Sequence, residues 1–127
     1  MRRVKFKVVR KIGERRFSAY VRGAYRLNYS KDAIVRAKEG ALGVAVFGRK
    51  EEAKTFCDRR SFFKIVRVLP VGRGRTVKVI SNNQSDRLLD IFYRYIAKYQ
   101  GIPRSSTLIP MAPPRGTMFY PAVEVLE

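Results

Sequence analysis

The chain has 127 residues and a formal net charge of +18, because 28 Lys and Arg face only 10 Asp and Glu. It contains no histidine and one cysteine, which excludes histidine-dependent catalytic triads, zinc sites built from Cys and His, and an internal disulfide. The length suits a single domain, and an apolar content of 46% is too high for a disordered basic tail.

The beginning of the chain predicts an antiparallel hairpin. Apolar and basic residues alternate over 4–9, which is typical of a half-buried strand whose Lys5 and Lys7 face water. A turn at 13–14 and a second alternating segment over 17–21 complete the hairpin.

Further strands are expected over 25–29, 33–38 and 42–47. The last of these is continuously small and apolar, which favours a strand covered on both faces. A short helix is expected over 49–57, because its apolar residues recur at intervals of three and four.

The second half of the chain predicts a buried strand over 63–71, a basic turn over 72–75 and a strand over 76–80. The clearest helix is expected over 86–100, with a serine N-cap and a glycine just beyond its end.

A proline-rich irregular segment is expected over 102–119, followed by a closing strand over 120–127. This order of elements predicts an α+β fold, with a mostly antiparallel sheet, one short and one longer helix, and a single domain. The predicted core consists of Phe6, Phe17, Val21, Val44, Val46, Phe56, Ile65, Val68, Leu88, Phe92 and Ile96.

The excess of positive charge favours a polyanionic partner, because Lys and Arg bind phosphates and release counterions. A basic strand face with an aromatic residue suits contact with phosphates and stacking of one base. The candidate nucleic-acid-binding residues are Lys5, Lys7, Arg16, Tyr20, Arg22, Arg26, Arg59, Arg60, Arg73 and Arg75.

Each part of this candidate site has a structural alternative. The hairpin face is equally consistent with a solvated surface on which Tyr20 packs against arginine side chains. The segment Gly72–Arg75 also suits an ordinary turn that carries solubilising charge. The cations at 59–60 also complement the negative end of the preceding helix.

Several segments together resemble a family of small proteins, of no known activity, that phages, archaeal viruses and their hosts encode. The resemblance lies in Val4–Val9, Ser18-Ala19, Tyr29, Gly43–Phe47, Ala53–Phe56, Pro113–Met118 and Val123–Leu126. The order strand, Gly-Phe, helix and strand also resembles part of an ADP-ribosyltransferase-type fold. That resemblance implies a catalytic glutamate, for which Glu124 is the candidate.

The leading hypothesis is therefore a small, non-enzymatic, virus-encoded module that binds DNA or RNA mainly through the phosphate backbone. The first alternative is a viral interaction factor or inhibitor whose basic face occupies an acidic or nucleic-acid-binding groove of a host protein. The third is a degenerate ADP-ribosyltransferase-like protein. No cofactor, metal or membrane partner is expected, and a cytoplasmic location is expected from the lone cysteine and the lack of a long apolar segment.

Overall fold

The computed structural model describes residues 3–19, 26–38, 41–77, 80–81, 110–111 and 113–127. The longer helix expected over 86–100 lies outside these residues. The same applies to residues 102–109 of the expected irregular segment and to six of the individually predicted residues, namely Tyr20, Val21, Arg22, Leu88, Phe92 and Ile96.

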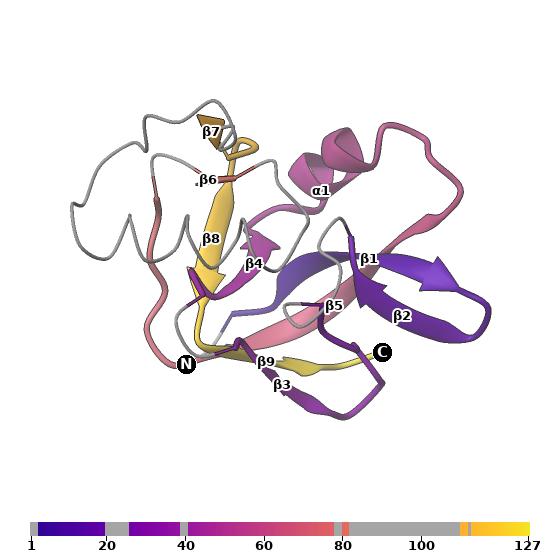
Figure 1. Ribbon diagram of the computed structural model, residues 1–127, viewed down its shortest axis with the longest axis horizontal. Coiled ribbons are helices and arrows are strands. Elements are labelled where there is room, and N and C mark those ends of the chain that lie inside the picture. The colour runs from indigo at the N-terminus through magenta and orange to yellow at the C-terminus, as the bar shows by residue number, and fades with distance from the viewer. Residues whose placement is uncertain (1–2, 20–25, 39–40, 78–79, 82–109, 112) are drawn as a thin grey trace.

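The described residues form an α+β fold that is mostly antiparallel sheet, as the sequence predicts (Figure 1). In chain order the elements are β1 (Lys5–Ile12), β2 (Arg15–Ser18), β3 (Ile34–Arg36), β4 (Val44–Phe47), α1 (Lys50–Cys57), β5 (Phe63–Val71), β6 (Ile80–Ser81), β7 (Pro110–Met111), β8 (Thr117–Tyr120) and β9 (Ala122–Val125).

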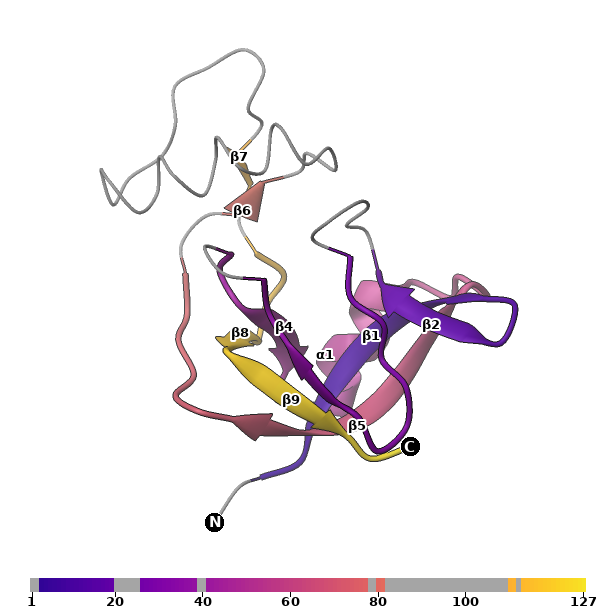
Figure 2. The same ribbon diagram turned by 60° about the horizontal axis from the view of Figure 1, so that its bottom comes forward.

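Seven strands form one sheet in the order β3-β9-β5-β1-β4-β8, and β2 pairs with β1. Strands β8 and β9 are separated only by Pro121, and they pair with β4 and β5 respectively. The paired strands β8-β4-β1-β5-β9 therefore form a path whose two end strands are joined by the chain through Pro121. This ring gives the sheet an inner face, and both views of the ribbon show the bend between β8 and β9 (Figures 1 and 2).

The inner face of the ring carries the larger of two apolar clusters. Every strand of the ring contributes to it, and Tyr29 packs among them. Its buried members are Val9, Tyr29, Val35, Val44, Val46, Val66, Val68, Tyr120, Val123 and Val125. Because β-branched valines pack well on a pleated surface, this composition suits the interior of a small closed sheet.

The second cluster lies on the outer face, beneath α1. Its buried members are Val8, Ala19, Phe47, Ala53 and Phe63, and four half-buried residues pack against them, namely Phe6, Phe56, Cys57 and Ile65. Of the predicted core, Val44, Val46 and Val68 are buried, whereas Phe6, Phe17, Phe56 and Ile65 are half-buried.

The N-terminal hairpin forms as predicted. Strand β2 pairs antiparallel with β1, from Val9 opposite Ser18 to Ile12 opposite Arg15. Gly13 in the connecting turn has a φ of 60°, which a residue without a Cβ adopts readily.

The short helix and the strand after it also form where they are expected. The backbone N–H of Arg49 donates to Oε1 of Glu52 at 3.2 Å at the start of α1. The helix ends at Asp58, which has a left-handed backbone with a φ of 48°. Strand β5 has the predicted bounds, Phe63–Val71.

Two expectations about the later chain need correction. The irregular segment does not extend to residue 119, because Thr117–Tyr120 pairs with β4 as strand β8. The described residues 76 and 77 are not in a strand. Their neighbour Arg75 makes an isolated bridge to Phe119. Prolines at 110, 113 and 114 suggest irregular backbone, but the four residues after Gly116 contain no proline and pair with β4.

The prediction that Lys7 faces water is wrong. Only 8% of Lys7 is exposed, because the face of β1 that carries it is the inner face of the ring. The Nζ atom donates to the carbonyl oxygen of Ala45 at 2.8 Å and lies 5.2 Å from the ring centroid of Tyr29. The closed sheet buries the inner face of β1 and α1 covers its outer face, so the middle of this strand has no solvated face and alternation alone misplaces this lysine.

Candidate functional site

The described cations are most concentrated where the β1–β2 hairpin lies beside the connection from α1 to β5. Residues 10–16 and 58–64 together hold seven Lys or Arg against two acids. We call these seven residues the hairpin–turn cluster, and they are Arg10, Lys11, Arg15, Arg16, Arg59, Arg60 and Lys64. The two segments lie side by side at the right-hand end of the molecule in both ribbon views (Figures 1 and 2).

Strand pairing and one backbone hydrogen bond hold the two segments together. Strand β1 pairs with β5 so that Arg10 is opposite Phe63 and Val9 is opposite Lys64. Beyond this register, the N–H of Lys11 donates to the carbonyl oxygen of Phe62 at 2.8 Å. The cations of the hairpin and of the connection are therefore neighbours because of backbone geometry.

Five members of the cluster are exposed, whereas Arg10 and Arg16 are half-buried. The guanidinium of Arg10 donates from Nε to the carbonyl oxygen of Ala19 at 2.9 Å. It also lies 4.8 Å from the ring centroid of Phe62 and 5.7 Å from that of Phe63. Arg60 lies 6.0 Å from the ring centroid of Phe63. The cluster thus combines exposed charge with cation–π contacts that fix two of its guanidiniums.

Phe62 is an exposed aromatic residue within this cluster. It is 42% exposed, and its ring meets Phe63 edge-to-face with centroids 4.6 Å apart. Phe63 in turn stacks on Phe56 of α1 at 5.9 Å. An exposed ring held against a buried aromatic network is a rigid apolar surface among positive charges.

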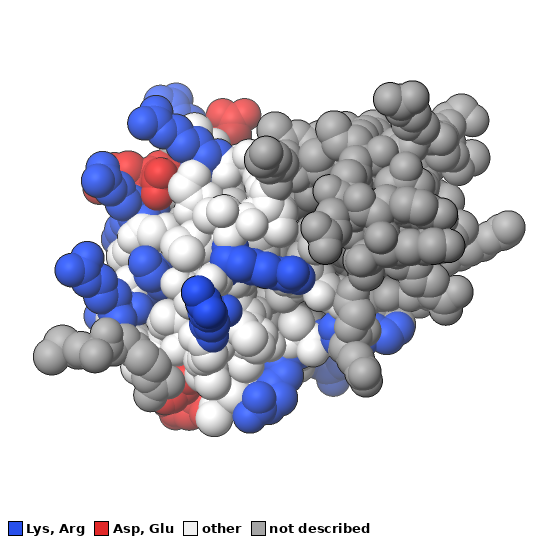
Figure 3. Space-filling model, turned by 90° about the vertical axis from the view of Figure 1, so that its left-hand side faces the viewer, with Lys and Arg blue, Asp and Glu red and all other residues white. Residues whose placement is uncertain are grey.

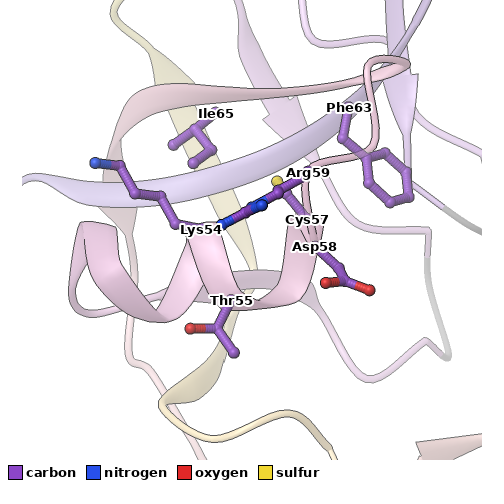
Figure 4. A pocket seen from close by; sticks show the side chains of 7 residues that line it. All are labelled: Lys54, Thr55, Cys57, Asp58, Arg59, Phe63 and Ile65. Carbon is purple, nitrogen blue, oxygen red and sulfur yellow. The ribbon is translucent and has the colours of Figure 1, made fainter.

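A shallow hollow of about 610 Å³ adjoins the cluster, between α1 and β5. Its lining residues are Lys54, Thr55, Cys57, Asp58, Arg59, Phe63 and Ile65 (Figure 4). Apolar atoms of Phe63 and Ile65 line the β5 side of it, and two cations and one carboxylate come from α1 and its C-terminal turn. Burial raises the pKa of the Cys57 thiol, so the thiol is not an activated nucleophile.

Four of the residues predicted from the sequence lie at this end of the molecule. Arg16, Arg59 and Arg60 belong to the cluster, and Arg26 lies beside it, with its guanidinium 4.0 Å from the ring centroid of Phe17 on β2. Sequence reasoning missed Arg10, Lys11, Arg15, Phe62 and Lys64. Phe62 and Lys64 lie close in sequence to the predicted Arg59 and Arg60, but only the pairing of β5 with β1 places them beside the hairpin.

The other described candidates lie elsewhere. Lys5 is half-buried and pairs with Val68, toward the opposite end of β1 from the hairpin. Arg73 and Arg75 follow the far end of β5, a nine-residue strand that spans roughly 30 Å at about 3.3 Å per residue. The guanidinium of Arg75 donates to the carbonyl oxygen of Leu42 from Nε at 3.2 Å and from Nη2 at 2.8 Å.

Charge is dispersed on the side of the molecule opposite the hairpin. There the Lys and Arg side chains of the described residues are interspersed with uncharged surface and a few acidic side chains (Figure 3). The turn at 72–75 is separated from the hairpin by the length of β5.

Lys7 and Tyr29 make up a buried polar pair inside the ring. Burial lowers the pKa of Lys7 to about 8. Burial also raises the pKa of Tyr29, and a side-chain hydrogen bond with Ser18 opposes this rise in part. Both effects have the same origin, because an apolar interior disfavours the charged form of either group.

Glu124, the residue that the resemblance to ADP-ribosyltransferases singles out, is half-buried on β9. It pairs with Ile34 of β3 and with Leu69 of β5, and it is not among the residues that line the hollow. The hollow and this glutamate therefore do not form one site.

Within the described ranges, no group of three or more His, Cys, Asp or Glu residues is placed to hold a metal ion. No helix in the same part of the chain is long and apolar enough to cross a membrane. Comparisons of the chain with protein-family models, with curated proteins and with solved structures find no match.

Proposed function

We propose that this protein is a nucleic-acid-binding module that contacts the sugar–phosphate backbone through the hairpin–turn cluster. The observation that carries the proposal is the convergence of seven cations from two separate segments, with only Glu14 and Asp58 as local acids. Such a density of like charge is unfavourable for the isolated chain, and a polyanion compensates for it by exchanging its own counterions for these side chains.

The geometry supports contact with phosphates rather than reading of base sequence. The exposed cations lie on a hairpin, on a turn and at the start of β5. Phosphate contacts position a protein on nucleic acid and carry little sequence information. The proposed binding is therefore of low sequence specificity. We include a cytoplasmic location in the proposal, since Cys57 is a free thiol.

The test compares two quadruple variants in a salt titration. The cluster variant replaces Lys11, Arg15, Arg59 and Lys64 with Gln. The control variant replaces Arg36, Lys50, Arg73 and Arg115 with Gln. All eight residues are exposed, and both variants lose the same charge. Binding to duplex DNA, single-stranded DNA and RNA is measured by fluorescence anisotropy at several salt concentrations.

Engagement of about five phosphates gives a slope of log affinity against log salt near −4 to −5 on duplex and shallower on single strands. We expect the cluster variant to lose roughly 0.7 to 0.9 in slope for each phosphate contact removed, and the control variant to retain most of the parental slope. If both variants give the same slope of log affinity against log salt, binding depends on net charge alone and not on the hairpin–turn cluster. If the parent protein binds none of the three polymers, the proposal fails and an acidic protein partner replaces it.

A further inference from the structure

Two features beside the hairpin–turn cluster are suited to contact bases rather than phosphates. Phe62 exposes an aromatic ring among the cations, and the hollow between α1 and β5 has an apolar side. Phe63 connects them, because it lines the hollow and its ring contacts that of Phe62. A surface that held phosphates alone would need neither the exposed ring of Phe62 nor the apolar side of the hollow.

We propose that the ligand of this cluster is single-stranded nucleic acid, whose unpaired bases stack on Phe62 and enter the hollow. This inference rests on the proposed function and specifies its ligand. In a duplex the faces of the bases are already stacked on one another, so a protein aromatic reaches them only after they are unstacked. Single strands present these faces directly, and stacking on a protein ring tolerates any base because every base has a π face.

The chemistry of the hollow matches one unpaired nucleotide. Phe63 and Ile65 offer apolar contact to the face of a base, and Lys54 and Arg59 offer charge to its phosphate. Asp58 also lines the hollow, but its carboxylate points away from Lys54, Arg59 and Ile65 in Figure 4, so the apolar pair and the two cations carry the match. The same hollow offers nothing that a phosphate backbone without bases would use beyond its two cations.

The first experiment separates bases from phosphates. Affinity is measured for a deoxythymidine strand of about 15 nucleotides, which is within the range of single-strand site sizes, for an abasic strand of equal length, and for a duplex. Phe62→Ala should weaken binding of the deoxythymidine strand roughly 5- to 150-fold, which corresponds to roughly 1–3 kcal/mol for one stacked base. Binding of the abasic strand and the salt slope should not change, because no phosphate contact is lost.

Two further variants keep the result interpretable if Phe62→Ala perturbs the fold. Phe62→Leu keeps apolar packing against Phe63 but lacks a flat ring, so it should also bind weakly. Phe62→Tyr keeps the ring and should restore the affinity. If Phe62→Leu binds the deoxythymidine strand as tightly as the parent does, there is no stacking and the inference is overturned.

Cys57 supplies an independent readout, because it is the one cysteine of the chain and lines the hollow. At saturation, the deoxythymidine strand should slow alkylation of this thiol by iodoacetamide, whereas an abasic strand at saturation should not. Equal protection by both strands overturns the assignment of a base to the hollow.

The two proposals fail in different ways. Salt-dependent binding of equal strength to the duplex, the abasic strand and the deoxythymidine strand retains the proposed function and overturns the single-strand ligand. Absence of binding to all three overturns both.

Discussion

Replacement of the buried Lys7 with Met should remove a pH-dependent part of the free energy of unfolding. In the folded protein the pKa of Lys7 is about 8, whereas an unfolded lysine titrates near 10.4. Between these values the unfolded chain binds more protons than the folded one, so the stability of the native protein rises with pH. Below pH 8 both states are protonated and the full penalty of the buried charge is present.

The magnitude follows from the two pKa values. The difference of somewhat more than two units corresponds to roughly 3 kcal/mol in total. Between pH 7 and pH 9.5 the native protein should gain roughly 2 kcal/mol from Lys7 alone, because the titration of the unfolded chain is incomplete at pH 9.5. The interval stops there because Tyr29, whose folded pKa is raised, reduces stability at higher pH, where the unfolded tyrosine ionises.

The assay is urea denaturation of the parent protein, of Lys7→Met and of Lys64→Met at both pH values. Lys64 is exposed on β5, so its replacement removes the same charge without removing a buried group. The parent and Lys64→Met should gain stability to the same extent, and Lys7→Met should gain roughly 2 kcal/mol less. Loss of the hydrogen bond to Ala45 changes the stability of Lys7→Met at both pH values alike and cancels in the comparison. If Lys7→Met shows the parental rise, Lys7 does not titrate in a buried site.

Three further predictions concern the fold and the cluster. Val68→Ala should reduce the free energy of unfolding by about 2 kcal/mol, because Val68 is fully buried and the loss of both methyl groups leaves a cavity. Val4 is 40% exposed, so Val4→Ala should change the free energy of unfolding by less than about 0.5 kcal/mol. Gly43→Ala should be more destabilising than Gly13→Ala in the same urea titrations, because both have positive φ but only at position 43 would a Cβ lie 2.9 Å from the carbonyl oxygen of Tyr120. The cluster variant defined above should be more stable than the control variant in low salt, and thermal melts should show this difference shrinking as salt screens the repulsion.

Local patterns predicted those elements whose neighbours follow closely in the sequence. The β1–β2 hairpin depends on a glycine turn between alternating segments, and α1 depends on its own apolar stripe, so both were correct. Strand β5 was predicted with its observed bounds because its sequence is rich in Val, Ile and Leu, with only Lys64 and Arg67 charged, and this composition needs no information about its partners. The closure of the ring through Pro121 was not predictable, since it depends on the pairing of β8 with β4 and of β9 with β5, and these strands are distant in sequence.

This missing closure explains the errors in the candidate site. Alternation placed Lys5 and Lys7 on a solvated face, but the ring turns that face inward and buries Lys7. The basic turn at 72–75 was grouped with the hairpin on charge alone, whereas β5 holds them at opposite ends. Conversely, Lys64 and Phe62 join the hairpin only because β5 pairs with β1, which no local pattern reveals.

The same arrangement relates the charge of the chain to its stability. Charges at opposite ends of β5 are separated by several times the Debye length of about 8 Å at physiological salt, so they repel one another weakly. Charges within the hairpin–turn cluster are neighbours and repel one another strongly, so among the described residues the electrostatic penalty of the folded state is concentrated at this end. A ligand that binds only the folded state raises the free energy of unfolding by an amount that grows with the ratio of its concentration to its Kd. A polyanion on the cluster would therefore stabilise the fold by mass action, and relief of the local repulsion would be part of the affinity that sets the size of this effect. The proposed binding would therefore be coupled to folding at the hairpin, and the turn at 72–75 would lie outside this coupling.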